Sequence, residues 1–236
     1  MAPGTLAYER YLDHLAAEAA RFDAAITAAP AGVSVPACPA WDRDALRDHQ
    51  AGVLAFWTRQ LADDATTGEP VTDGVEVEAS RPVTDLASTM VDRLAAIGVD
   101  QPCWNWSGAD QVAGWVARRM AQELSVHRVD AESIAGAAAP IADDIAHDGI
   151  DELLDVFVDA APGTETGAGI VVELLDPTRR AILTTEGAVR STDDPVAYLH
   201  GSASDVVLSL WSRASPATWT GDERAPEAWR HLAEFE

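Results

Sequence analysis

The strongest constraint on the fold is a helical spacing of apolar side chains that fills the first 138 residues and then ends. Apolar residues recur at steps of three and four in four segments: 5–29, 43–63, 84–97 and 115–138. Such spacing gathers apolar side chains on one face of a helix. Four helices joined by short to medium links predict an up-and-down four-helix bundle. Asp42 is the expected N-cap of the second helix, because its carboxylate can accept from the first free backbone amides.

The character of the chain changes after Pro140. One more helix is expected over 143–160, followed by strand-like runs at 169–175, 181–185 and 196–201 and by helices at 203–213 and 226–235. The sequence therefore predicts an α+β protein of two domains. Residues 1–140 form a four-helix bundle, and residues 141–236 form a smaller mixed α/β domain with an antiparallel sheet.

The charge of the chain argues against two classes of partner. The 236 residues include 16 lysines and arginines and 39 aspartates and glutamates, which gives a formal net charge of -23. Such a surface repels phosphate backbones and anionic lipid. We therefore expect neither a nucleic-acid partner nor a membrane partner, and an anionic substrate would need arginines placed beside it.

Other features of the chain favour a cytoplasmic protein. The first ten residues lack a basic start followed by an apolar run, and no stretch of about 18 apolar residues exists. Cys38 and Cys103 form no CxxC pair, so reduced thiols are expected.

Polar residues interrupt the faces of two helices that should be apolar. The predicted inward face of the second helix consists of Leu46, His49, Val53 and Phe56, and that of the fourth consists of Val116, Met120, Glu123, His127, Asp130 and Ile134. An unpaired buried charge costs several kcal/mol, so these groups need partners. Two interpretations stay open on spacing alone. One is a hydrogen-bonded network between His49 and Glu123, and the other is a divalent metal held by His49, Glu123 and His127.

Residues around these positions have more ordinary explanations. Asp130 is expected to accept a hydrogen bond near the site rather than to bind a metal. His14 is expected on a solvent-facing helix surface. Arg119 and Arg128 flank Glu123 and His127 as anchors for an anion or as surface ion-pair residues, and the loop tryptophans Trp104 and Trp106 are expected to pack in their loop.

Three blocks of the sequence resemble the mycothiol-dependent maleylpyruvate isomerase-like family. The first is VPACPAW at 35–41, followed by Leu46, His49 and AGV at 51–53. The second is WVARRMAQELSVHRVDAE at 115–132, and the third combines GSASD at 201–205 with LWSR at 210–213. The chain departs from the family's pattern at Gln122, where a histidine is usual. This departure affects the expected polarity of the pocket and the choice of substrate.

The resemblance implies a DinB-like metal-binding bundle, with His49, Glu123 and His127 as the ligands of a divalent metal, usually zinc. It also implies a low-molecular-weight thiol, mycothiol in actinobacteria, as cosubstrate. A zinc-bound thiolate would add to a small electrophile, either in a maleylpyruvate-type cis–trans isomerisation or in thiol S-transfer. By the family analogy, Arg213 is the catalytic cation that anchors an anionic substrate. A helix-terminal charge explains Arg213 about as well.

Two other functions remain possible for the same fold. One is a metal-dependent hydrolase that uses a zinc-bound water, and the other is a non-catalytic binding or regulatory module. The expected partners of an enzyme are a small electrophile and a low-molecular-weight thiol, and the protein is expected to be a monomer or a weak homodimer.

Overall fold

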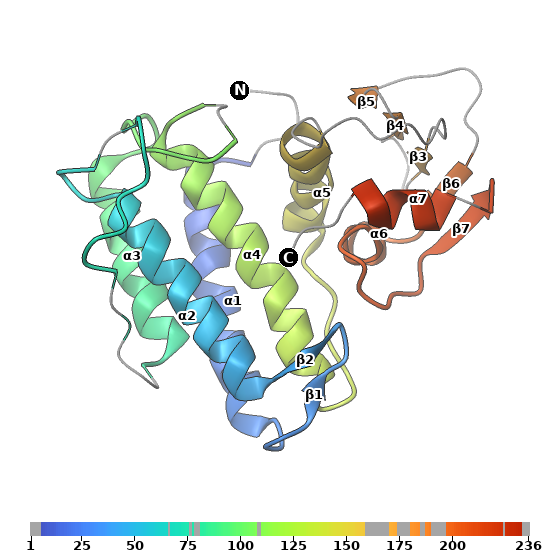
Figure 1. Ribbon diagram of the computed structural model, residues 1–236, viewed down its shortest axis with the longest axis horizontal. Helices are drawn as coiled ribbons and strands as arrows, with labels where there is room; N and C mark the ends of the chain where they lie inside the picture. The colour runs from blue at the N-terminus through green and yellow to red at the C-terminus, as the bar shows by residue number, and fades with distance from the viewer. Residues whose placement is uncertain are drawn as a thin grey trace. The chain divides into compact units, whose positions relative to one another are not determined.

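Four long helices form the first of two units into which the computed structural model divides, Leu6–Ile141. They are α1 (Tyr8–Ala28), α2 (Arg43–Gln60), α3 (Val83–Ile97) and α4 (Ala113–Ser133), and they lie side by side in Figure 1. The structure describes residues 6–65, 67–75, 77, 81–107, 110–158, 170–173, 180–184, 187–189, 197–223 and 225–232. The predicted helices and the predicted α+β class are confirmed. No helix in the described part of the chain is long and apolar enough to cross a membrane.

Helices α1 and α3 run in opposite directions. Near the end of α1, the Asp23 carboxylate accepts hydrogen bonds from the amides of Val83 and Thr84 at the start of α3, at 3.1 and 2.8 Å. At the other end of the pair, the Tyr8 hydroxyl donates to the Leu94 carbonyl at 2.9 Å. Asp23 thus serves as a distant cap, because Pro82 at the N-cap of α3 has no side-chain acceptor.

Helices α2 and α3 run in the same direction, so the predicted up-and-down order is wrong. Arg93 near the end of α3 donates from Nε to the carbonyl of Leu61, which follows α2, at 2.7 Å. The connection 61–82 is long enough to lead the chain back along the bundle. Gln60 fixes its path, since its side chain exchanges two 2.8 Å hydrogen bonds with the backbone of Val71.

A two-stranded hairpin, which the sequence analysis did not predict, lies between α1 and α2. Its strands are β1 (Ser34–Val35) and β2 (Cys38–Asp42), and Figure 1 shows it at the end of the bundle where α2 begins. Asp42 ends the hairpin and begins α2, where Oδ1 accepts from the amides of Asp44 and Ala45 at 3.1 and 3.0 Å. The predicted N-cap is confirmed. The hairpin also holds Trp41 just before the start of α2, the helix that carries His49.

Helix α4 is the most enclosed helix of the bundle, and it buries charged as well as apolar residues. Arg128 is fully buried, and its Nε donates to Glu18 Oε2 on α1 at 2.6 Å. Its Nη1 donates to Glu132 Oε2 at 2.9 Å and to the Ala139 carbonyl. The expectation that Arg128 is a surface ion-pair residue is therefore wrong.

The second unit contains Ala142–Glu236 and combines helices with one sheet. Helix α5 (Asp143–Glu152) continues as a π-helical segment over Leu153–Val158, and residues 159–160 of the predicted helix lie outside the described residues. The sheet has the order β5-β4-β3-β6-β7, and its strands are β3 (Ile170–Glu173), β4 (Arg180–Thr184), β5 (Gly187–Val189), β6 (Ala197–His200) and β7 (Thr218–Gly221).

The sheet is mixed rather than antiparallel as predicted. Strands β3, β4 and β5 form an antiparallel meander, and β6 pairs with the remaining edge of β3 in parallel. Strand β6 therefore runs in the same direction as β3. Helix α6 (Ala203–Leu210) and helix α7 (Ala225–Leu232) complete the unit, with the Trp229 indole donating to the Leu210 carbonyl at 2.7 Å.

Candidate metal centre

Three side chains from two helices converge on one point in the bundle. His49 Nε2 on α2 lies 3.3 Å from Glu123 Oε1, and His127 Nε2 on α4 lies 3.2 Å from the same oxygen. One ligand atom from each residue lies within 4.8 Å of the other two. Glu123 and His127 are one helical turn apart and therefore share a face of α4. The structure brings together the three residues that the sequence singled out, and their role as metal ligands stays a prediction.

Asp130 orients the His127 ring. Its carboxylate oxygen Oδ2 lies 2.8 Å from His127 Nδ1, and Asp130 is 1% exposed. An ionised carboxylate can only accept, so Nδ1 carries the proton that is donated. Nε2 is then the atom directed at Glu123. This is the position that the sequence analysis gave to Asp130, an acceptor for the ring rather than a ligand.

Arg119 pairs with the outer oxygen of Glu123. Its Nη2 donates to Glu123 Oε2 at 3.0 Å, and Arg119 is only 5% exposed. The alternative of a surface ion pair is wrong here too, because the side chains of Arg119 and Glu123 are only 6% and 19% exposed. Glu123 therefore has two distinct oxygens: Oε2 is bound by the guanidinium, and Oε1 faces both histidines.

Trp41 of the hairpin lies against the two histidine rings. Its ring centroid lies 4.7 Å from that of His49 and 6.3 Å from that of His127, while the two imidazoles meet edge to face at 5.0 Å. Trp41 belongs to the VPACPAW motif, and the motif alone indicates no role for it at this site. Gln122, where the family usually has histidine, is buried at 2% exposure.

The charges of the cluster stabilise one another. Burial raises the pKa of Glu123. Burial is outweighed by the positive charge of His127, by the hydrogen bonds from both histidines and by the positive charge of Arg119, and these hold the pKa well below its ordinary value. Burial lowers the pKa of His127, but the Glu123 carboxylate and the hydrogen bond to Asp130 raise it to about 9. Without a metal, the pair is therefore an imidazolium facing a carboxylate.

The donor set fits a divalent metal. Two imidazole nitrogens and one carboxylate oxygen suit zinc and its neighbours, and three protein ligands leave a position for an exogenous ligand. If the His127 ring is neutral with its proton on Nδ1, its Nε2 carries a lone pair that faces Glu123 Oε1, and Oε1 is an acceptor too. Something positive must lie between these two atoms. A proton fills this role in the metal-free cluster, and a metal cation would replace it.

Arg213, the predicted catalytic residue, belongs to the second unit. It follows α6, where its amide donates to the Leu208 carbonyl and its Nη1 to the Trp211 carbonyl, both at 2.8 Å. Ser212 before it adopts the left-handed conformation, with φ of 59°. A serine at a helix end where glycine is usual indicates local strain, which concentrates at functional positions.

The other residues considered from the sequence lie elsewhere in the bundle. Trp104 stacks on Trp57 with ring centroids 5.8 Å apart, and Trp106 meets Trp115 at 5.7 Å, so both pack against helix residues. His14 is 7% exposed, and its expected solvent-facing position is wrong.

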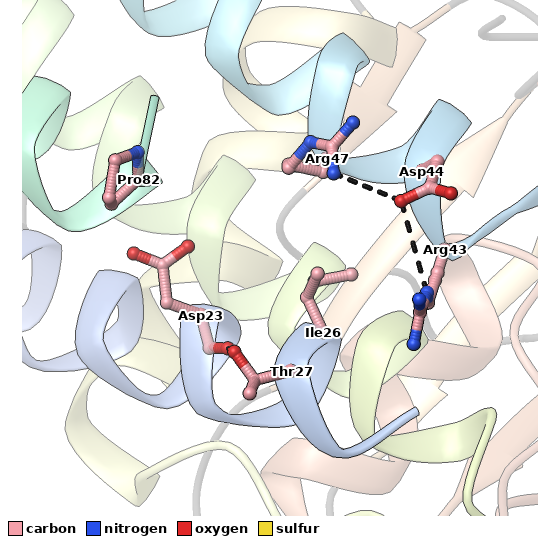
Figure 2. Close-up of a pocket in the computed structure, with 7 residues that line it drawn as sticks. All are labelled: Asp23, Ile26, Thr27, Arg43, Asp44, Arg47 and Pro82. Atoms are coloured by element: carbon pink, nitrogen blue, oxygen red, sulfur yellow. Dashed lines mark hydrogen bonds and ion pairs between the residues drawn. The ribbon is translucent and has the colours of Figure 1, made fainter. Parts of the chain in front are cut away.

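A cavity of about 450 Å³ lies between the end of α1 and the starts of α2 and α3 (Figure 2). Its charged groups pair with one another: Asp44 Oδ1 accepts from Arg47 Nη1 at 2.9 Å and lies 3.8 Å from Arg43 Nε. Asp23 is occupied as the cap of α3. None of the three converging residues lines this cavity, and its groups need no ligand to balance them.

Comparisons with known proteins agree with this fold. The family described as "Mycothiol maleylpyruvate isomerase N-terminal domain" matches residues 12–132, and the family described as "MDMPI C-terminal domain" matches residues 144–228. Because the first match alone spans more than half of the chain, the protein belongs to the mycothiol-dependent maleylpyruvate isomerase family. The resemblance stated from the sequence motifs is confirmed.

Two crystal structures of the mycothiol-dependent maleylpyruvate isomerase share the fold of this chain. One is similar with a TM-score of 0.63 at 15% identity, and the other, a mutant in which alanine replaces a histidine, with a TM-score of 0.61 at 17% identity. Each match covers 92% of this chain and 95% of the other. At such identities the similarity concerns the fold alone. Among curated protein sequences no significant match is found.

Proposed function

We propose that this protein is a metal-dependent, mycothiol-using enzyme that activates a thiol for addition to a small electrophile. The observation that carries the proposal is the convergence of His49 Nε2 and His127 Nε2 on Glu123 Oε1 at 3.3 and 3.2 Å. Family membership supports the thiol, and the donor set supports a divalent metal, with zinc as the first choice.

The residues of the bundle hold and shape the site. His49, Glu123 and His127 would bind the metal through three atoms, while Asp130 and Arg119 fix the orientation of two of these ligands. The Trp41 ring packs against that of His49. When bound, the metal would supply Lewis acidity that lowers the pKa of a thiol at the remaining position.

The reaction that follows is addition to an electron-poor double bond. The sulfur adds to one carbon, the remaining single bond rotates, and the same sulfur leaves, which regenerates the thiol and gives cis–trans isomerisation. If the sulfur instead stays attached while the other carbon takes up a proton, or if the sulfur displaces a leaving group, the result is thiol S-transfer. Both reactions begin with the same activation of the thiol.

We propose Arg213 as the catalytic cation that anchors the substrate. Maleylpyruvate-type substrates are dianions, and a chain with a net charge of -23 repels them unless a local cation compensates. The strained turn at Ser212 supports a functional position for Arg213.

The domain organisation, the cellular location and the oligomeric state are proposed from the sequence. Residues 1–140 would form the metal-binding domain and residues 141–236 the smaller α/β domain, in a cytoplasmic monomer or weak homodimer. The acidity of the chain supports small-molecule partners and argues against nucleic acid.

The test combines metal analysis with turnover. We expect one equivalent of zinc or a related divalent metal per chain, and turnover of a panel of small electrophiles only when a thiol is added. Bound metal with thiol-independent hydrolysis would favour the hydrolase instead. A chain that binds no metal and turns over no electrophile with any thiol would leave only a binding or regulatory role.

Metal affinity is expected to rise with pH. Because the pKa of His127 is about 9 without metal, a metal ion must displace a proton at neutral pH. The apparent dissociation constant for Zn²⁺ should therefore fall roughly tenfold per pH unit between 7 and 9 and level off above 9. Competition with a chelator at fixed free Zn²⁺ measures this. Asp130→Asn should move the levelling point to lower pH, and a constant affinity across this range would contradict a protonated His127.

A further inference from the structure

We infer that Arg119 is a positioning residue that makes Glu123 bind a metal through one oxygen only and leaves the metal more electrophilic. The inference rests on the proposed function, since it concerns how the three ligands hold their metal. The sequence left Arg119 open as an anchor for an anion or as a surface ion-pair residue, and the inference goes beyond its orientation of Glu123.

The contacts of Glu123 separate its two oxygens. Arg119 Nη2 lies 3.0 Å from Oε2, while both imidazoles lie within 3.3 Å of Oε1. A carboxylate can otherwise bind a metal through both oxygens. With Oε2 bound by a guanidinium that is 5% exposed, only Oε1 is directed at the position between the histidines. The protein would then supply three donor atoms to a bound metal.

Helix stability alone does not explain this pair. Arg119 precedes Glu123 by four residues, and in an isolated helix this order of charges is weaker than the reverse order. Burial adds a desolvation cost that a surface arginine would avoid. A buried pair in the less favourable order is better explained by what it does to Glu123.

The charge of Arg119 also acts on whatever binds at the open position. A guanidinium on Oε2 withdraws charge from the carboxylate, so Glu123 neutralises less of the charge of the metal. An anionic fourth ligand is then held more tightly than it would be beside an unpaired Glu123. This favours binding of a thiol as its thiolate.

The experiment uses Co²⁺ as a spectroscopic substitute for zinc in the full chain, with 2-mercaptoethanol as the thiol. We compare the wild type with Arg119→Met, which removes the charge, and Arg119→Lys, which keeps it. Arg59→Met serves as the matched control, because Arg59 pairs with Asp64 at the surface. Circular dichroism establishes that each variant is folded.

In the wild type we expect the intense visible bands of four-coordinate Co²⁺. In Arg119→Met the second oxygen of Glu123 becomes available, so these bands should lose intensity several-fold as the ion becomes five-coordinate. The near-ultraviolet band of Co²⁺-bound thiolate should need roughly tenfold more 2-mercaptoethanol to appear. Arg119→Lys should restore most of both signals, and Arg59→Met should match the wild type.

The possible failures are distinguishable. A wild type that binds no Co²⁺ and no Zn²⁺ overturns the metal centre and the role of Arg119 together. A wild type that binds Co²⁺, with a folded Arg119→Met that has the same spectrum and the same thiol affinity, overturns the role of Arg119 alone. Loss of both signals in Arg119→Lys as well as in Arg119→Met shows that packing rather than charge is responsible, and this also overturns the inference.

Discussion

Replacing His49 by alanine is expected to abolish stoichiometric metal binding and to lower thiol-dependent turnover by on the order of 10³-fold, while the protein stays folded. His49 is the most suitable of the three residues to remove, because 30% of its side chain is exposed near the start of α2. Truncation there leaves no buried charge without a partner. Removing Glu123 instead would take away a carboxylate that pairs with the buried Arg119, and a loss of folding would then obscure the result.

Three measurements on purified protein test this expectation: metal content, thiol-dependent turnover and circular dichroism. His200→Ala provides the matched control, because His200 lies on β6 in the other unit and hydrogen-bonds to Thr220. It should keep the metal and the activity. A His49→Ala variant that retains one equivalent of metal and full turnover would rule out the three-ligand site.

The spacing of Glu123 and His127 could be read from the sequence because both lie on one helix, where residues four apart share a face. Their meeting with His49 depends on how α2 packs against α4. There the predicted inward face was displaced: the buried residues of α2 include Leu46, Gln50, Leu54 and Trp57, not Val53 and Phe56. Because the buried Gln50 is polar, it interrupts the helical spacing of the buried apolar residues. His49 lies beside the buried face and not within it.

The buried arginines could not be predicted from their own helix. A charge pattern on α4 gives no sign that Arg128 is neutralised by Glu18, which is 110 residues away on α1. Similarly, the direction of α3 depends on the connection 61–82. In the folded chain, this direction is fixed by contacts such as that between Arg93 and Leu61. Local periodicity therefore located the helices, whereas pairings between distant segments decided their order and the burial of charge.

Arg128→Ala is expected to cost about 3–5 kcal/mol of unfolding free energy, the usual effect of breaking a buried ion pair from one side. Arg128 is fully buried, and its loss leaves the carboxylate of Glu18, which is 3% exposed, without its closest partner at 2.6 Å. It also removes the donors to the Ala139 and Pro140 carbonyls, which hold the chain as it leaves the bundle. Urea unfolding followed by circular dichroism measures the change.

Two comparison variants show where this free energy comes from. Arg59→Ala breaks a pair in which the Asp64 side chain is 72% exposed, and it should cost no more than about 1 kcal/mol. The double variant Arg128→Met with Glu18→Leu removes both charges, so it should recover much of the loss, because the penalty comes from the unpaired carboxylate. If the double variant is no more stable than Arg128→Ala, the backbone contacts at 139–140 carry the stability instead. A measurement of Zn²⁺ affinity then shows whether Arg128 contributes to stability alone or to metal binding as well. Arg128 is next to His127 in sequence but hydrogen-bonds to α1, so the folded double variant should bind Zn²⁺ as tightly as the wild type.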